Sequence, residues 1–300
     1  MAASQDNLDT LSKEGAAQGV VTQNNRKSYF GTLPIRYARI FLLHFQDVFQ
    51  NRSRSFVWFL LSLLNPLVVL LFWRGAFQNS SSPLGDWTYN AIAGYYLLLV
   101  IAGSFLQVHI EEDIARRDIQ LGFLSQYLMR PFSYILMKFF QELPWRIIQG
   151  FFGVLVLLLF SFFIIKNGIV LVHDPAQIIA SIIILVLAFS ISFLFKMIVG
   201  ISALWITEFS GLQELIGVVD IIFAGFIMPL ALFPPFIKTL SYVLPFAYMI
   251  YFPIISLLGR LTTMESLQTI GIQVVWLMIF GIIYRMMWQR GIKKFTALGQ

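Results

Sequence analysis

The residues of this chain that could bind a metal ion include one run of His109, Glu111, Glu112 and Asp113. Imidazole and carboxylate groups are ligands of divalent cations. The helical zinc site of metalloproteases needs two histidines four residues apart with a glutamate beside the first, whereas the three histidines here stand at 44, 109 and 173. We therefore expect no metal site and interpret the acidic run as the cytoplasmic exit of an apolar segment.

Other ionisable residues stand within apolar segments, where a charge costs about 2.5–3.5 kcal/mol at the centre of a membrane helix. Asp220, in GVVDIIFAGFIMPL, is the clearest case. It could line a substrate path together with Lys196, form an ion pair with Lys196 or Arg285, or lie close enough to the membrane surface to be hydrated. The sequence leaves these interpretations open.

Glu142 and Arg146 are four residues apart, the spacing of an ion pair on one face of a helix. Pro144 lies between them and could disturb that spacing, because proline removes a backbone donor and crowds the preceding turn. A structural role is expected for this pair rather than a role in transport.

No motif for nucleotide binding or hydrolytic catalysis is present. The chain has no G-x-x-x-x-G-K-[ST] phosphate loop, no G-x-S-x-G nucleophile elbow and no paired-aspartate motif of an intramembrane protease. It has no cysteine, which excludes disulfides, thiolate catalysis and iron–sulfur clusters. We therefore expect a chain that is not an enzyme and has no cofactor. If ATP drives it, a separate chain binds the ATP.

The composition explains why these residues are set in apolar surroundings. Hydrophobic residues make up 58% of the 300 residues, charged residues only 12%, and the mean hydropathy is +0.77. Soluble domains carry roughly 25% charged residues. The net charge of +6 is not gathered on a soluble module, so we expect no nucleic-acid partner. The fold class is therefore predicted to be all-α, in a multi-pass membrane protein surrounded by lipid.

Apolar runs of about 20 residues, the length that crosses hydrocarbon, recur along the chain. Residues 1–33 are polar and predicted to form a disordered cytoplasmic tail, and 34–300 a transmembrane domain. Residues 34–53 have the pattern of an interfacial amphipathic helix, or alternatively of the start of a long first span. Residues 234–262, interrupted by prolines, suit a re-entrant outer pair of helices, although a full crossing would reverse the C-terminus. Six spans are predicted, at about 55–77, 89–110, 145–165, 177–203, 215–233 and 267–288.

The positive-inside rule orients these spans. With the N-terminus inside, 17 of the 21 Lys and Arg residues fall in cytoplasmic stretches. The other four, Arg74, Lys166, Lys238 and Arg260, stand near predicted span ends, where long side chains reach the membrane surface. Both termini are therefore predicted to be cytoplasmic.

The segment between the second and third spans, residues 111–141, is the most informative polar stretch. Residues 113–120 can form a short helix with Ile114 on one face and Arg116 and Arg117 exposed, and Gly122 is a plausible helix stop. Leu121, Phe123, Leu124 and Leu128 then supply an apolar surface. A short helix joined rigidly to two spans is suited to transmit the movement of a partner.

Three stretches together resemble type 2 ABC-transporter permeases. IQLGFLSQYLMRPFSY (119–134) resembles the cytoplasmic loop of that family, LPFAYMIYFPIISLLG (244–259) the outer segment before its last span, and RGIKKFTALG (290–299) its basic C-terminal tail. The resemblance implies an export-type permease of the cytoplasmic (inner) membrane. It also implies two six-span subunits, identical or homologous, that assemble with two separate ATPase subunits.

The same resemblance implies which residues couple the permease to its ATPase. The residues that match the family's coupling helix are Asp113, Ile114, Arg116, Arg117, Asp118 and Leu121, with Arg130 and Pro131 shaping the return into the third span. The polar N-terminal extension is longer than expected for this family.

Three other classes of function compete with this interpretation. The first is a secondary transporter or channel that needs no ATPase; such proteins often contain inverted repeats, and no convincing repeat relates residues 55–165 to 177–288. The second is a membrane-embedded enzyme, disfavoured because Asp220, Glu142 and His109 are expected at different depths. The third is a structural membrane scaffold, which co-purification of an ATPase would distinguish from a permease.

Overall fold

The computed structural model describes residues 35–48, 50, 57, 64, 68–77, 86–164 and 171–295. The predicted tail, 1–33, lies outside these residues, as does most of the first predicted span, of which the helix Val68–Phe77 is described. Helices account for the regular structure of the described residues, which confirms the all-α fold class.

The described helices follow one another as short and long elements. After residues 35–48 and Val68–Phe77, they are α3 (Tyr89–Leu106), the π-helix η1 (Asp113–Gln120), α4 (Leu124–Leu128), α5 (Tyr134–Ile164), α6 (Pro175–Ile201), the 3-10 turn η2 (Ser202–Leu204), α7 (Phe209–Phe223), the 3-10 turn η3 (Leu230–Leu232), α8 (Pro235–Val243), α9 (Phe246–Met249), α10 (Tyr251–Leu257) and α11 (Thr263–Ile292).

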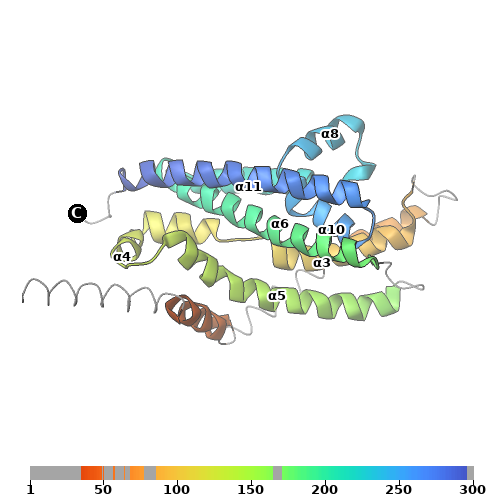
Figure 1. Cartoon of the computed structure of the whole chain (residues 1–300), viewed down its shortest axis with the longest axis horizontal. Coiled ribbons are helices and arrows are strands. Elements are labelled where there is room, and N and C mark those ends of the chain that lie inside the picture. Colours follow the sequence, from red (N-terminus) through yellow and green to blue (C-terminus); the bar gives the residue numbers. More distant parts are fainter. Residues whose placement is uncertain are drawn as a thin grey trace, which may run out of the picture.

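The long helices α5, α6 and α11 run along the length of the molecule, and α6 and α11 lie side by side (Figure 1). Three described helical segments are long and apolar enough to cross a membrane: Tyr89–Leu106, Pro175–Leu204 and Thr263–Ile292. Helix α10 packs against α3 and α6, and Gln273 of α11 donates hydrogen bonds to the carbonyls of Ile184 in α6 (3.1 Å) and Tyr248 in α9 (3.0 Å). The total of six spans stays a prediction.

Helix α5 differs from the predicted span 145–165, because it begins at Tyr134 and continues through Pro144. The predicted loop 111–141 is therefore helical from Tyr134 onward. The physical reason is that the charged residues of its first half, Lys138, Glu142 and Arg146, all find partners inside the protein. These partners stabilise a helix that extends beyond the apolar run.

The predicted span 215–233 is also different, because α7 begins earlier, at Phe209, and ends at Phe223. Gly225 follows with φ +90°, a left-handed conformation that favours glycine. Hydroxyls of α3 hold this break: Tyr95 donates to the Gly225 carbonyl at 2.8 Å and Tyr96 to the Ile227 carbonyl at 2.5 Å. Tertiary contacts therefore end a helix that hydropathy alone would extend.

Residues 234–262 contain three short helices, α8, α9 and α10, where the sequence predicted a pair. Pro235 occupies the first turn of α8 and Pro245 precedes α9, positions that tolerate a missing N–H. The end of α10 returns to the beginning of α6, where the N–H of Val172 donates to the Leu257 carbonyl at 3.0 Å. The re-entrant position of this segment stays a prediction.

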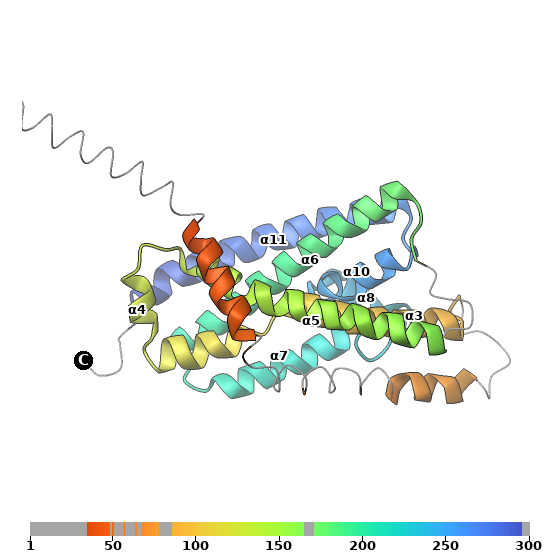
Figure 2. The same cartoon turned by 90° about the horizontal axis from the view of Figure 1, so that it is seen from below.

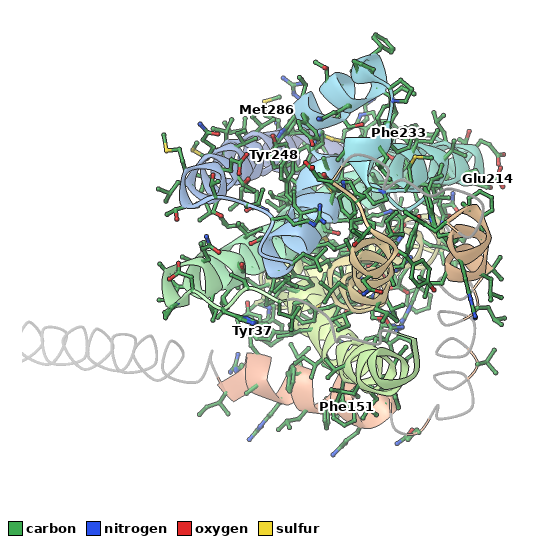
Figure 3. The ribbon with its side chains drawn as sticks, turned by 90° about the vertical axis from the view of Figure 1, so that its right-hand side faces the viewer. Tyr37, Phe151, Glu214, Phe233, Tyr248 and Met286 are labelled. Carbon is green, nitrogen blue, oxygen red and sulfur yellow. The ribbon has the colours of Figure 1, made fainter. Side chains whose placement is uncertain are left out.

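The helix 35–48 lies across the long axis of the bundle, beside the start of α5 (Figures 2 and 3). The Tyr37 hydroxyl accepts a hydrogen bond from the Ser133 N–H at 3.2 Å, and its ring stacks on Phe140 with centroids 5.3 Å apart. This orientation suits the predicted interfacial helix, whose place in a membrane surface stays a prediction.

Candidate functional site

The π-helix η1 has one buried and one exposed face. Ile114 and Asp118 are fully buried, whereas the side chains of Arg116 and Arg117 are 56% and 57% exposed. The predicted helix at 113–120 and its orientation are therefore confirmed. Gly122, with φ +79°, directs the chain away after η1, as predicted for a helix stop.

Ion pairs with a spacing of four residues stiffen the exposed face. Arg116 Nε lies 3.2 Å from Glu112 Oε1 and Arg117 Nη1 lies 3.7 Å from Asp113 Oδ1. The chain leaves η1 through a wide turn in which the N–H of Leu121 donates to the Arg116 carbonyl at 3.0 Å. Such π-helical turns are frequent at functional sites. The arginines are held in place while their guanidinium groups stay open to solvent.

The buried face of η1 is fastened to α5 by Lys138, whose side chain is 1% exposed. Its ammonium lies 2.6 Å from Asp118 Oδ2 and 2.7 Å from Asp113 Oδ2, and the Tyr134 hydroxyl also donates to Asp118. Burial raises the pKa of the Asp118 carboxyl, and the nearby Lys138 ammonium opposes that rise. Lys138 attracts both carboxylates of η1 at once, so η1 and the start of α5 form one unit.

A close backbone approach fastens η1 to α6. A Cβ placed on Gly200 would lie 2.8 Å from Cβ of Ile114 and 3.1 Å from the Glu111 carbonyl oxygen. Real Cβ atoms do not tolerate such contacts, so only glycine allows the end of α6 to pack this tightly. Further along, the Gln120 side chain donates to the Thr207 carbonyl at 3.3 Å, beyond the end of η2.

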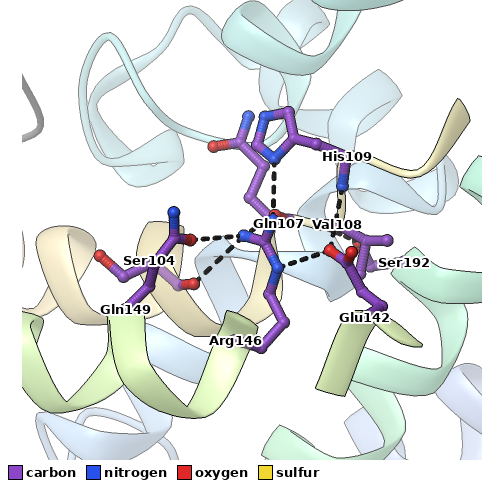
Figure 4. Close-up of polar contacts among 8 residues, drawn as sticks. All are labelled: Ser104, Gln107, Val108, His109, Glu142, Arg146, Gln149 and Ser192. Atoms are coloured by element: carbon purple, nitrogen blue, oxygen red, sulfur yellow. Dashed lines mark hydrogen bonds and ion pairs between the residues drawn. The ribbon is translucent and has the colours of Figure 1, made fainter. Parts of the chain in front are cut away.

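The linker between α3 and η1 is held by Arg146 of α5 (Figure 4). Its guanidinium donates to Glu142 Oε1 at 2.6 Å, to the Gln107 carbonyl at 2.6 Å and to the Ser104 carbonyl at 3.3 Å. These carbonyls belong to the last turn of α3 and the residue after it, which otherwise lack helical partners. The predicted Glu142–Arg146 pair is confirmed, and it has a structural role.

His109 joins the same cluster, contrary to expectation. Its N–H donates to Glu142 Oε1 at 3.4 Å, and its Nδ1 lies 3.5 Å from Arg146 Nη2. The expectation that His109 and Glu142 lie at different depths was therefore wrong. The physical reason is that α5 extends below its apolar run and brings Glu142 level with the linker. Within the described part of the chain, no group of three His, Cys, Asp or Glu side chains is arranged to hold a metal ion.

A third buried cation, Lys196 of α6, joins the linker to α7. Its ammonium lies 3.1 Å from Glu111 Oε1 and 3.5 Å from Asp220 Oδ2. Of the interpretations that the sequence left open for Asp220, the structure shows the ion pair with Lys196, and the sequence did not indicate that Glu111 joins it. Three elements therefore meet at one ammonium group.

The exposed residues around η1 form a mixed surface that we name the η1 rim. Leu121 is 67% exposed, Met129 is 79% exposed, and Arg130 and Pro131 are exposed beside them. Leu124, expected on this apolar surface, is instead buried because it turns into the core. The residues that define the η1 rim are Arg116, Arg117, Leu121, Phe123, Leu128, Met129, Arg130 and Pro131.

Sequence reasoning missed Lys138, Tyr134 and Gly200 as parts of this site. Lys138 had a signal, since it is a lone cation in the apolar stretch YILMKFFQ and stands four residues before Glu142. Gly200 had no such signal in the sequence, because its role depends on which residue of η1 packs against it.

The comparisons with known proteins agree with this architecture. A family model described as ABC-2 family transporter protein matches residues 63–299, which include every element of the site. No curated protein matches the chain. Because the match covers most of the chain, it confirms the resemblance drawn from the sequence motifs. The chain belongs to the ABC-2 transporter family and is a membrane permease component of an ABC transporter rather than its ATPase.

Proposed function

We propose that this chain is the permease subunit of an exporter in the cytoplasmic membrane, with both termini in the cytoplasm. A separate ATPase subunit docks on the η1 rim, and a second permease subunit, identical or homologous, completes the substrate path. The family supports the permease component and its ATPase partner; the direction of transport, the six spans and the paired permease are parts of the proposal.

The observation that carries the proposal is the contrast between the two faces of η1. A coupling element needs solvent-exposed groups that a partner can bind and a buried face that moves with the spans. Arg116 and Arg117 are the exposed groups, and Ile114 and Asp118 lie on the buried face. The apolar Leu121 and Met129 beside the arginines give the rim the mixture of anchors and charges typical of protein interfaces.

The contacts around η1 indicate how a movement of the docked ATPase would be transmitted from η1 to the membrane helices. Lys138 transmits it to α5, the contact between Ile114 and Gly200 transmits it to α6, and Lys196 with Asp220 transmits it to α7. Because Asp220 and Lys196 are buried and paired, we propose that they act as a mechanical link, in place of the direct substrate contact suggested by the sequence.

Charge reversal of the rim tests this function. The full chain, tagged and gently solubilised from native membranes, is expected to retain a P-loop ATPase identifiable by mass spectrometry. The variant Arg116→Glu with Arg117→Glu is expected to lose most of the retained ATPase and of the ATP turnover in the eluate, because two attractive charges become repulsive.

A matched control reverses two exposed cations of the same chain outside η1, Arg290→Glu with Lys293→Glu. This variant is expected to keep the ATPase. Elution of the wild-type chain without any ATPase would overturn the proposal and favour an ATPase-independent transporter. Equal retention by both variants would refute docking on η1.

A further inference from the structure

A cavity of about 570 Å³ opens among η3, α8, α10 and the segment that precedes α3, away from η1. These elements gather toward the end of the bundle opposite α4 (Figure 1). The residues that line the cavity are Asp86, Trp87, Ala231, Leu232, Lys238, Tyr251, Ile255 and Arg260. None of them takes part in the contacts of η1, so the coupling site leaves this cavity unexplained.

Two cations of the cavity rest on aromatic rings. The guanidinium carbon of Arg260 lies 4.1 Å from the centroid of the buried Trp87 ring, and Arg260 Nη2 donates to the Asp86 carbonyl at 3.2 Å. The Lys238 ammonium lies 5.7 Å from the centroid of Tyr242. Rings of this kind orient cations without neutralising them.

The charge of the cavity is positive on balance. Among the described residues, neither Arg260 nor Lys238 has a carboxylate within ion-pair distance, although Asp86 contributes one carboxyl to the lining. Arginine and lysine that lack a protein counter-ion beside a concave surface are the groups that bind phosphate. The cavity therefore favours an anion.

Part of the remaining lining is apolar, and so is part of the adjoining outer surface. Ala231, Leu232 and Ile255 form the wall beside the cations. On α8, which carries Lys238, Phe236 is 78% exposed and Val243 is 66% exposed. Apolar side chains exposed beside a basic residue on a short helix are suited to the boundary between lipid tails and headgroups.

We propose that this cavity binds the phosphate headgroup of an anionic phospholipid, with Arg260 and Lys238 contacting the phosphate. The apolar wall of Leu232 and Ile255 covers the glycerol and upper acyl carbons. Because the site faces away from η1, it needs no ATPase to form and can be measured on the permease chain alone. Its failure would therefore leave the proposed ATPase docking untouched.

The experiment is native mass spectrometry of the full chain in detergent, supplied with phosphatidylglycerol or with phosphatidylcholine. The wild-type chain is expected to retain phosphatidylglycerol in preference. Lys238→Gln with Arg260→Gln is expected to bind it about tenfold more weakly, because both charge-assisted contacts are removed. Arg74→Gln removes an exposed cation outside the cavity and is expected to behave like the wild type.

Competition separates the two sources of a phosphate group. Displacement of the lipid by millimolar inorganic phosphate would assign recognition to the headgroup alone, whereas lipid that resists phosphate would show that the apolar wall contributes. Equal retention of both lipids by the wild type, or equal loss in Arg74→Gln, would overturn the site. If the double variant unfolds, Arg260→Lys keeps the charge but not the planar fork, and its affinity is expected to fall between those of the wild type and Arg260→Gln.

Discussion

Lys138 of α5 and Asp118 of η1 form an ion pair of 2.6 Å in which neither side chain is more than 1% exposed. The two residues are separated by the turn through α4, so the pair closes a compact loop at the base of the bundle. The Tyr134 hydroxyl donates to the same carboxylate oxygen, Asp118 Oδ2, and its ring stacks on Trp288 of α11 with centroids 4.8 Å apart. One buried carboxylate thereby ties η1 to α5 and, through Tyr134, to α11.

We expect Lys138→Met to destabilise the protein by about 3–5 kcal/mol, because removing one partner of a buried ion pair leaves Asp118 charged and uncompensated. The thermal unfolding temperature of the purified chain in detergent measures this effect. Arg116→Met serves as the control, since its pair with Glu112 is exposed and worth about 0–1 kcal/mol. Equal unfolding temperatures for the two variants would mean that the Lys138 pair does not hold η1.

Gly200→Ala is expected to loosen the contact between α6 and η1. The added Cβ would meet Ile114 at 2.8 Å, and overpacking of this kind costs about 1–3 kcal/mol. Gly211→Ala in α7 is the matched control, because its Cβ would meet nothing within 4 Å. Both changes improve helix propensity equally, so a lower unfolding temperature and weaker ATPase stimulation in Gly200→Ala alone would isolate the steric effect.

Arg146→Lys is expected to destabilise the protein by about 1–3 kcal/mol although it keeps the charge, because buried acceptors lose their donor. A lysine ammonium cannot donate at the same time to Glu142, Gln149 and the carbonyls at the end of α3, as the planar guanidinium does. Arg290→Lys, at an exposed position of α11, is the control. Amide hydrogen exchange of residues 104–112 measures the stability of the linker itself. Unchanged protection in Arg146→Lys would argue that Arg146 does not hold this linker.

The sequence predicted those parts of the site that depend on local spacing. The helix at 113–120 follows from residues within one turn of each other and from Gly122, and the Glu142–Arg146 pair follows from its spacing of four. The apolar runs likewise predicted that the fold is helical and membrane-spanning, since their lengths depend only on composition.

The rest depends on which helices become neighbours, and hydropathy carries no such information. Lys138 finds Asp118 only because α4 turns the chain back, and α7 ends early because the Tyr95 hydroxyl of α3 binds the Gly225 carbonyl. His109 meets Glu142 only because α5 extends below its apolar run. Each of these contacts joins residues distant in the sequence, where periodicity gives no constraint.

Two substitutions in the buried group of Lys196, Glu111 and Asp220 are expected to lower the unfolding temperature by different amounts. Lys196→Met leaves two buried carboxylates without their cation, and Glu111 Oε2 already has no hydrogen-bond partner among the described residues. Asp220→Asn instead leaves the 3.1 Å pair of Lys196 with Glu111 in place. Lys196→Met should therefore lower the unfolding temperature clearly more than Asp220→Asn.

The ion pair of Lys196 with Asp220 also joins α6 to α7, so losing it is expected to affect coupling to the ATPase as well as stability. Asp220→Asn removes the charge that holds α7 to Lys196, so we expect coupled ATP turnover to fall several-fold while the fold persists. An assay of ATP turnover in the co-purified complex, beside its melting curve, separates these effects. If Asp220→Asn melts like the wild type and also turns over ATP at the wild-type rate, α7 does not receive its movement through this pair. In that case the contact between Ile114 and Gly200 would remain as the route from η1 into α6.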